Sequence, residues 1–358
     1  MKINFFIGGL SGGGAERVIC NLSNYLYNKG HTVTILTMAD DQPSYSLDDG
    51  VRRIALLNEE ERRGFIYNSC LRLWRFCKYL KQEKTDVYVV MLPVTIIMML
   101  VMRWLIKGKI IASERNSPST YARITQRLLK FLAKQAEGWV FQTKEEYEWY
   151  GRVVKKGIII PNAINPDFIK PVYTGVRKKT IVTVGRMTEQ KNQALLIRAF
   201  AEVVKDFPLY NLKIYGDGEK RDELIILSEK LGLVNNIEFP GYLKNIGEHI
   251  KDSSLFVLSS DFEGMPNALM EAMALGLPCI STDCDGGGAK FLIENGKNGM
   301  LVPKGDAEIL ADAMRKMLSD KAFAEQCGQE AHKIVTQLEP HVIYSKWESF
   351  INDVLKAK

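Results

Sequence analysis

The sequence is poor in the residues that build metal centres and disulfide frameworks. Its 358 residues include four histidines and six cysteines, all widely separated and without a C-x-x-C pair. Histidines this far apart form no ligand cluster. Scattered cysteines with no signal peptide before them fit a reducing cytoplasm better than secretion. The residues in question are Cys20, Cys70, Cys77, Cys279, Cys284 and Cys327, and His31, His249, His332 and His341.

The sequence also lacks a hydrophobic run long enough to cross a bilayer. Its most apolar stretch, from Val94 to Met102, is interrupted by Arg103 and is shorter than the roughly 20 residues that a span requires. We interpret this stretch as a core helix. Internal repeats and low-complexity segments are absent too. At 358 residues, the chain exceeds the size at which one core keeps growing, so two soluble domains are expected.

Charge is unevenly distributed along the chain. Residues 1–170 carry 25 Lys and Arg against 16 Asp and Glu, a net +9, and residues 171–358 carry 23 against 26, a net −3. Much of the excess lies in two helical segments, at 62–81 and 122–135, that interleave cations with apolar side chains. Such helices can lie on an anionic membrane, or their apolar residues can pack inward. No basic run is dense enough to predict nucleic-acid binding.

Short β-rich runs alternate with helical patterns throughout, which predicts parallel sheets of the βαβ kind. The first series starts at INFFIGG, is followed by a helix from about Ala15 to Asn28, and ends at GWVFQT. A second series runs from TIVTVG to GMLVP, and a helical pattern follows from Pro340. We therefore predict a first Rossmann-like domain at 1–166, a linker at 167–179, a second such domain at 180–338 and a terminal helix at 339–358.

A glycine-rich loop, GGLSGGGAERV, follows the first strand and opens the first helix. Glycines let the backbone approach a phosphate or a sugar, and the helix terminus attracts negative charge. The loop lacks the spacing of the dinucleotide fingerprint, although Asp40 could imitate its ribose-binding acid. A plain tight turn explains the loop as well as a ligand contact does.

Charged and glycine-rich loops follow several strands of the second half. Arg186 comes directly after a strand, and Lys191 stands at the entrance of the next helix. Two cations that converge there can bind a diphosphate, whereas the alternative is a pair of solvated charges. The segments GDG at 216–218 and GYL at 241–243 follow two further strands, so these loops share the strand-end rim where α/β sheets bind ligands.

The segment EGMPNALME places Glu263 in a loop and Glu271 about two turns into a helix. Pro266 suits the first turn of that helix, because its ring fixes φ and its missing N–H would be unpaired there. Backbone N–H groups at the helix start attract a phosphate, and the two carboxylates can hold hydroxyl groups on either side. This arrangement suits a nucleotide sugar.

The segments GRMTEQKN, GDGEKR, FPGYL and EGMPNALMEAMALGLPCISTDCDGGG resemble, in this order and spacing, the family 4 retaining glycosyltransferases. The resemblance covers essentially the whole chain and is greatest for bacterial enzymes that extend lipid-linked or surface polysaccharides. It implies the α/β GT-B fold, with two Rossmann-like doubly wound parallel-sheet domains facing a cleft and a C-terminal helix that crosses back to the first domain. It also implies a cytoplasmic protein, peripheral at the inner face of the cell membrane.

The resemblance implies roles for matching residues. Arg186 and Lys191 would hold the donor diphosphate, a UDP-sugar being favoured, and Glu263 would contact the donor sugar. Other donor contacts are implied at Gly185, Gly216, Tyr242, Gly264, Met265, Pro266, Asn267 and Glu271. Contacts with a glycan or lipid-linked acceptor, or with its phosphate, are implied at Gly13, Gly14, Glu16 and Arg115. No metal or other cofactor is implied.

Three details bear on these roles. Many relatives carry a histidine where this chain reads SERNSP, and Arg115 could bind an acceptor phosphate instead. The loop GGGAKFLI has Ala289 and Lys290 in place of the family's proline and acid. Asp283, Cys284 and Asp285 spell the D-x-D signature of metal-dependent glycosyltransferases, but they lie in a segment that matches the metal-free family.

Two other classes of protein remain open on the sequence alone. A nucleotide-sugar epimerase or an NAD-dependent oxidoreductase could also be built on tandem α/β domains. A basic membrane-surface binding protein would explain the cationic helices but not the motifs of the second half.

Overall fold

The computed structural model describes residues 1–40 and 42–357 and divides into two compact units. One unit comprises Met1–Asn162 with His341–Lys358, and the other comprises Ala163–Pro340. The chain therefore passes into the second unit before the segment 167–179 that we expected to be a linker. Most of that segment is exposed, with Val176 93% exposed, but Phe168 is buried and Arg177 donates a hydrogen bond of 2.8 Å to the carbonyl oxygen of Gly276.

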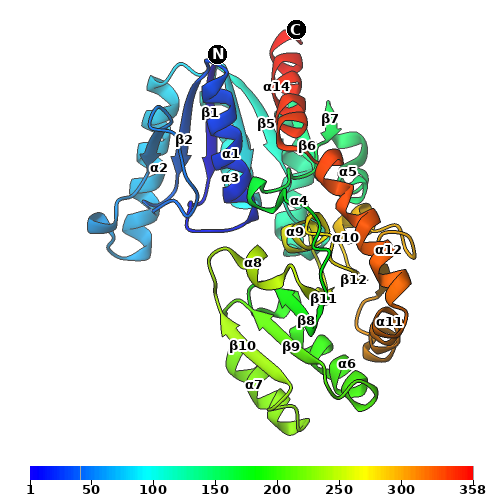
Figure 1. Ribbon diagram of the computed structural model, residues 1–358. Helices are drawn as coiled ribbons and strands as arrows, with labels where there is room; N and C mark the ends of the chain where they lie inside the picture. Colours follow the sequence, from blue (N-terminus) through cyan, green and yellow to red (C-terminus); the bar gives the residue numbers. More distant parts are fainter. Residues whose placement is uncertain (41, 358) are drawn as a thin grey trace. The chain divides into compact units, whose positions relative to one another are not determined.

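The first unit is built on a seven-stranded parallel sheet with the order β3-β2-β1-β4-β5-β6-β7 (Figure 1). Central strands such as β4 are buried along their whole length, as expected where helices cover both faces of a parallel sheet. The predicted strands are confirmed, and β7, a three-residue strand at the sheet edge, was not predicted. The strands are β1 (Lys2–Ile7), β2 (Thr32–Thr37), β3 (Arg52–Ala55), β4 (Val87–Met91), β5 (Lys109–Ser113), β6 (Gly138–Phe141) and β7 (Gly157–Ile159).

Helices flank this first sheet. Phe76 of α2, Ile96 of α3 and Leu129 of α4 belong to one buried cluster, so these three helices cover the same face of the sheet. The α-helices are α1 (Gly14–Asn28), α2 (Phe65–Gln82), α3 (Pro93–Val101), α4 (Arg123–Leu132), α5 (Lys144–Tyr150) and α14 (Pro340–Lys356). Single 3₁₀ turns lie at η1 (Glu59–Glu61), η2 (Arg103–Leu105), η3 (Pro118–Thr120), η4 (Ala133–Gln135) and η5 (Gly151–Val153).

Helix α3 contains the most apolar stretch of the sequence but is only half a core helix. Ile96 and Met99 are fully buried, whereas Val94 and Val101 are exposed. The prediction of a core helix was therefore wrong for the outer face of α3. In the described residues, no helix combines the length and the hydropathy needed to cross a membrane.

The second unit has a six-stranded parallel sheet with the order β10-β9-β8-β11-β12-β13. Its strands are β8 (Lys178–Val184), β9 (Asn211–Tyr215), β10 (Ile237–Gly241), β11 (Ser253–Leu258), β12 (Cys279–Asp283) and β13 (Met300–Pro303). Its α-helices are α6 (Gln193–Asp206), α7 (Arg221–Lys230), α8 (Ile246–Ile250), α9 (Asn267–Ala274), α10 (Gly288–Leu292), α11 (Ala307–Ser319), α12 (Lys321–His332) and α13 (Ile334–Gln337), with 3₁₀ turns at η6 (Pro166–Phe168) and η7 (Glu189–Lys191). The strand order reverses between β8 and β11, and ligands bind at such a switch point in open α/β sheets.

Candidate functional site

Two loops meet at the switch point of the second sheet. The loop after β8 carries Arg186 and leads through η7 to Lys191, and the loop after β11 carries Ser260 and Glu263. Because β8 and β11 are neighbouring parallel strands, their carboxyl ends open onto the same edge of the sheet. The site is thus assembled from segments about 70 residues apart in the chain.

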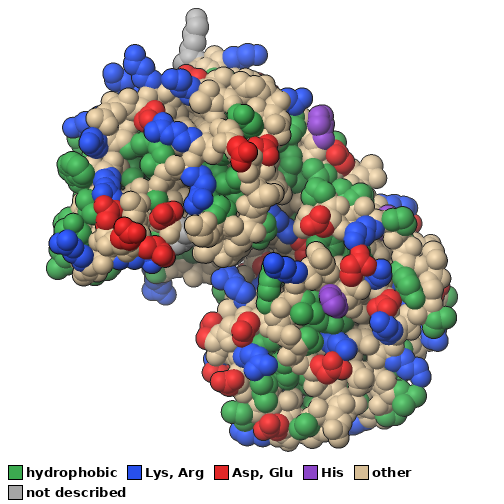
Figure 2. Space-filling model, turned by 60° about the vertical axis from the view of Figure 1, so that its left-hand side comes forward, with side chains coloured by type: hydrophobic (Ala, Val, Ile, Leu, Met, Phe, Trp, Pro, Cys, Tyr) green, Lys and Arg blue, Asp and Glu red, His purple; other side chains and the backbone are tan. Residues whose placement is uncertain are grey.

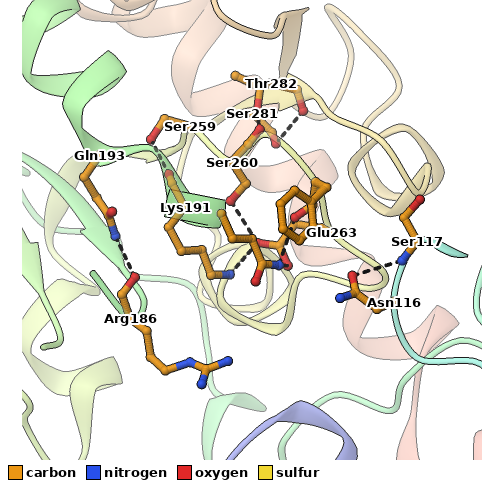
Figure 3. A network of polar contacts seen from close by, with 12 residues as sticks. Asn116, Ser117, Arg186, Lys191, Gln193, Ser259, Ser260, Glu263, Ser281 and Thr282 are labelled. Carbon is orange, nitrogen blue, oxygen red and sulfur yellow. Dashed lines mark hydrogen bonds and ion pairs between the residues drawn. The ribbon is translucent and has the colours of Figure 1, made fainter. Parts of the chain in front are cut away.

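An ion pair joins these loops. The Lys191 ammonium donates to Oε1 of Glu263, and Oγ of Ser260 donates to the same oxygen over 2.8 Å. Figure 3 shows Lys191 and Ser260 converging on the Glu263 carboxylate. The Lys191 side chain is 18% exposed and that of Glu263 is 8% exposed. The pair is consequently held in a largely desolvated position at the rim of the sheet.

The backbone around the pair is fixed by side chains that the sequence did not single out. Asn192, in the left-handed conformation, caps α6 by accepting from the N–H of Leu195, and its amide donates to Asp261 over 3.0 Å. Gln190 donates to the carbonyl oxygen of Phe262 over 2.9 Å. The two loops are thus tied together on both sides of the ion pair. The only sequence signal for this was the capping residue Asn192 before an apolar helix.

Arg186 behaves differently from Lys191. Its side chain is exposed and makes no ion pair with any described residue, and Figure 3 shows its guanidinium without a polar contact. We expected Arg186 and Lys191 to converge on one anion site. In the structure Lys191 pairs with Glu263, whereas the exposed Arg186 has no ionic partner among the described residues.

Helix α9 begins next to Glu263. Pro266 is the residue before the first helical turn, one position earlier than we expected, and it has φ −75°. A Cβ atom on Gly288 would lie 1.7 Å from the carbonyl oxygen of Gly264, so the loop 286–288 packs directly on the loop that precedes the helix. This contact fixes Gly264, Met265 and Asn267 at the helix start, where the backbone dipole favours an anion. Glu271 lies further along α9 and is 9% exposed.

The glycines after β9 have a packing role. Gly216 has φ +125°, and a Cβ atom there would lie 2.0 Å from the carbonyl oxygen of Gly185. Gly218 has φ +156° and approaches the carbonyl oxygen of Met187 in the same way. Gly185 and Gly216, both predicted to contact the donor, are thus brought together by the structure. Their contact requires glycine at position 216 even without a ligand.

Tyr242 follows β10 at the same edge of the sheet and is 80% exposed. An exposed aromatic ring offers a flat apolar surface with a polar tip. This placement is compatible with the base contact that the family resemblance implies for Tyr242.

The D-x-D segment is occupied by local ion pairs. Asp285 lies 2.7 Å from the Lys304 ammonium, and Asp283 lies 3.8 Å from that of Lys290. Burial, with the nearby Glu263 charge, raises the pKa of Cys284 to about 12, so its thiol is protonated at neutral pH. No group of three or more His, Cys, Asp or Glu side chains within residues 1–40 and 42–357 is arranged to hold a metal ion.

The amino-terminal glycine loop leads into α1, which begins at Gly14. A Cβ atom on Gly13 would lie 2.3 Å from Oε2 of Glu16, so the Glu16 carboxylate folds back over Gly13. Oη of Tyr45 donates to the carbonyl oxygen of Gly13 over 3.2 Å. A negative side chain in the first turn is favourable for the helix dipole. The carboxylate of Glu16 therefore lies over the backbone that we predicted to approach a ligand.

Arg115 lies in a buried polar network rather than on the surface. It is 9% exposed, its guanidinium stacks 5.3 Å above the Trp347 ring of α14, and its Nη1 donates to Asn162 over 3.0 Å. Its Nε and Nη2 atoms have no hydrogen-bond partner among the described residues. Arg115 thus packs on α14 within the first unit, and these two atoms are donors that the described residues leave unpaired.

Two buried carboxylates accompany Arg115. Glu114 accepts from Oη of Tyr121 over 2.6 Å and from Oη of Tyr150 over 2.8 Å, and its burial raises its pKa. Burial, with the nearby charge of Glu114, raises the pKa of Glu146 to about 8. Burial lowers the pKa of Arg115 to about 10, against the opposing effect of both carboxylates. Glu146 was not predicted, because nothing in its local sequence separates it from an ordinary helix-start acid.

Two protein-family models match this chain. Residues 167–334 match the family model Glycosyl transferases group 1, and residues 12–168 match Glycosyltransferase Family 4. Together the two models match residues 12–334. The chain therefore belongs to the family 4, group 1 glycosyltransferases, and the predicted family is confirmed.

Individual proteins support this placement. The chain is 27% identical over 367 residues to a Campylobacter jejuni GalNAc-alpha-(1->4)-GalNAc-alpha-(1->3)-diNAcBac-PP-undecaprenol alpha-1,4-N-acetyl-D-galactosaminyltransferase, with 100% of both chains covered. It is 31% identical over 250 residues to a Streptomyces coelicolor exopolysaccharide phosphotransferase, but it spans only 26% of that relative's length. Anabaena Alr3699/HepE, solved with UDP and glucose, matches with a TM-score of 0.84 at 18% identity, covering 98% of this chain and 99% of that one. The structural similarity confirms the GT-B fold.

Proposed function

We propose that this chain is a retaining glycosyltransferase that moves a sugar from a nucleotide sugar, with UDP favoured, to a hydroxyl of a glycan acceptor. The acceptor is a polyprenyl-diphosphate-linked or cell-surface polysaccharide intermediate. The observation that supports this proposal most directly is the Lys191–Glu263 ion pair at the β8–β11 switch point, beside the amino terminus of α9. The Campylobacter relative, named for an undecaprenol-linked acceptor, and HepE, solved with UDP, support the choice of substrates.

The donor side of the proposal uses the second unit. The diphosphate lies at the start of α9 and near Arg186, where the helix terminus and an uncompensated guanidinium favour negative charge. Lys191 stabilises the departing UDP, and no metal ion takes part. Glu263, whose second oxygen Oε2 makes only a long 3.4 Å contact to Gln190, orients the hydroxyl groups of the sugar. Met265, Pro266 and Asn267 line the sugar and phosphate, as the family resemblance implies.

The remaining donor and acceptor roles follow the same resemblance. Glu271 holds the ribose, and Tyr242 lies near the base. Gly13, Gly14, Glu16 and Arg115 contact the acceptor or its phosphate. The acceptor hydroxyl attacks the anomeric carbon from the side of the leaving group, the bond to UDP breaks, and the hydroxyl proton leaves with the phosphate oxygen.

Titration calorimetry with UDP, GDP and NAD tests the proposed donor. We expect UDP binding that Lys191→Ala weakens, with no NAD binding and no effect of EDTA. Lys297→Ala is a matched control, because Lys297 forms an exposed ion pair with Glu294. A panel of UDP-sugars with and without a lipid-linked acceptor then separates the activities. NAD binding would point to an oxidoreductase, and sugar interconversion without acceptor would point to an epimerase.

A further inference from the structure

Helix α4 exposes two parallel stripes of side chains. Ile124, Leu128 and Phe131 are spaced by four and three residues and are exposed, Phe131 to 81%. Arg123, Arg127 and Lys130 each precede one of these residues and form a second stripe beside the first. Arg123 and Arg127 make no ion pair among the described residues. Inward packing explains only Leu129 and Leu132, the buried residues of α4.

The neighbouring elements continue this pattern. Trp104 of η2 is 80% exposed, and on α2 Phe65, Ile66 and Trp74 are exposed. Helix α3 contacts both α4 and η2, and η2 contacts α2, so these elements form one continuous layer. The alternative that the apolar residues of these basic helices pack inward therefore fails for Phe65, Ile66, Trp74, Ile124 and Phe131, which are exposed. Exposed apolar patches of this extent mark interaction surfaces.

The charge of this layer has one sign. The helices α2 and α4 contain seven Lys and Arg and no Asp or Glu. Figure 2 shows hydrophobic and cationic side chains intermingled over the first unit on the face it draws. Some cations also lie on aromatic rings, with Lys78 5.3 Å from the Trp74 ring and Lys130 4.1 Å from that of Trp149. The exposed residues thus combine apolar side chains, indole rings and positive charge.

We propose that this surface, defined by Ile66, Trp74, Trp104, Ile124, Phe131 and the cations Arg123 and Arg127, docks on an anionic lipid bilayer. Indole and phenyl rings enter the boundary between headgroups and acyl chains, while Arg and Lys extend to the lipid phosphates. A headgroup layer accommodates intermingled apolar and cationic side chains, whereas a second copy of this chain would bring like charges together. The proposed lipid-linked acceptor gives membrane binding a biological purpose, and to that extent the inference rests on the proposed function. The binding itself depends only on this surface.

Co-sedimentation of the full chain with vesicles tests the proposal. We expect binding to phosphatidylglycerol–phosphatidylcholine vesicles that falls with added salt, and little binding to phosphatidylcholine alone. The triple variant Trp104→Ser, Ile124→Ser, Phe131→Ser should lower the partition coefficient at least about tenfold. The charge variant Arg123→Gln, Arg127→Gln should lower it about tenfold on anionic vesicles only.

Leu209→Ser with Val234→Ser is the matched control, because both side chains are exposed and belong to the second unit. It should bind vesicles like the parent chain. UDP affinity and the melting temperature are measured for every variant. If a variant of this surface binds vesicles less well but keeps normal UDP affinity, the result supports the proposed membrane-docking surface. If neither the parent chain nor any variant binds UDP, the result contradicts the proposed function and leaves the membrane-docking proposal unaffected.

Tryptophan fluorescence gives a second readout. Of the five tryptophans, Trp139 and Trp347 are fully buried whereas Trp104 is 80% exposed. Anionic vesicles should shift the emission to the blue, and Trp104→Phe combined with Trp74→Phe should remove most of that shift, since both rings belong to the proposed surface. The proposal is overturned if the triple variant sediments like the parent, if neutral vesicles bind equally well, or if light scattering shows a dimer that the triple variant dissociates.

Discussion

Each unit has a cluster of charged side chains in loops that follow its strands, but one cluster lies at the rim of its sheet and the other is buried. In the second unit, Lys191 and Glu263 form a pair at the rim, with Arg186 exposed beside it. In the first unit, Arg115 is buried near Glu114 and Glu146, with its guanidinium 5.3 Å from the Trp347 ring. A charge at the rim can exchange its partner for a ligand, whereas a buried charge can bind one only through the polar atoms that the surrounding packing leaves unpaired. The two clusters therefore differ in how much of their charge a ligand can reach.

The units differ in net charge as well. The first contains 27 Lys and Arg against 17 Asp and Glu, a net +10, and the second contains 21 against 25, a net −4. In the first unit, α2 and α4 contribute seven Lys and Arg and no Asp or Glu. In the second unit, two of the 21 Lys and Arg, Arg186 and Lys191, lie on the segment that follows β8. Local placement therefore matters more for the donor site than total charge.

The largest expected effect is on catalysis. Glu263→Ala and Lys191→Ala should each lower turnover by about a hundredfold or more, because electrostatic groups of this kind supply about 3 kcal/mol. Initial rates of UDP release with donor and acceptor measure the effect. Lys297→Ala should retain the parent rate. Parent-like turnover in either of the first two variants would refute the site.

The next effect is on the free energy of unfolding, which should respond differently to the loss of Arg115 and of Arg186. Arg115→Met removes the hydrogen bond to Asn162, the stacking on Trp347 and the cation nearest to the buried carboxyl groups, and should cost about 3 kcal/mol in the free energy of unfolding. Arg186→Met should change that free energy by less than about 0.5 kcal/mol, since its side chain is exposed. Urea unfolding at neutral pH measures both, with Arg152→Met as the exposed control of the first unit. Equal losses in the free energy of unfolding for Arg115→Met and Arg186→Met would contradict the difference between the buried and the exposed arginine.

A third effect is on the pH dependence of stability. The pKa of Glu146 is raised to about 8 in the folded chain, against about 4.3 for an unfolded glutamate. The folded chain therefore holds a proton that the unfolded chain releases, and stability should fall as pH rises through this window. Glu146→Gln should flatten the melting temperature between about pH 5 and pH 8. Glu145→Gln, an exposed neighbour on α5, should retain the parent slope, and a parent-like slope in Glu146→Gln would exclude this group as the cause.

The sequence was most informative where local patterns repeat. Alternating strands and helices predicted both sheets, because buried parallel strands need continuous apolar runs and the crossover helices need amphipathic ones. It also predicted that Arg186, Lys191 and Glu263 would lie at strand ends. It missed Asn192, whose contact with Asp261 joins distant segments, and Glu146, whose altered pKa depends on burial. It also missed Ser260, because a serine three residues before a glutamate carries no pattern of its own.

By itself, then, the sequence determined the fold class, the family and the strand-end position of the donor motifs, because these depend on short-range periodicity and spacing. Only the tertiary structure decided which charges meet. It paired Lys191 with Glu263 across 72 residues and left Arg186 without a partner. It buried Arg115 and exposed Trp104 and Phe131, although arginine is usually exposed and aromatic residues are usually buried. The physical reason is that ion pairing and burial are set by which segments pack together, a property that no local stretch of sequence contains.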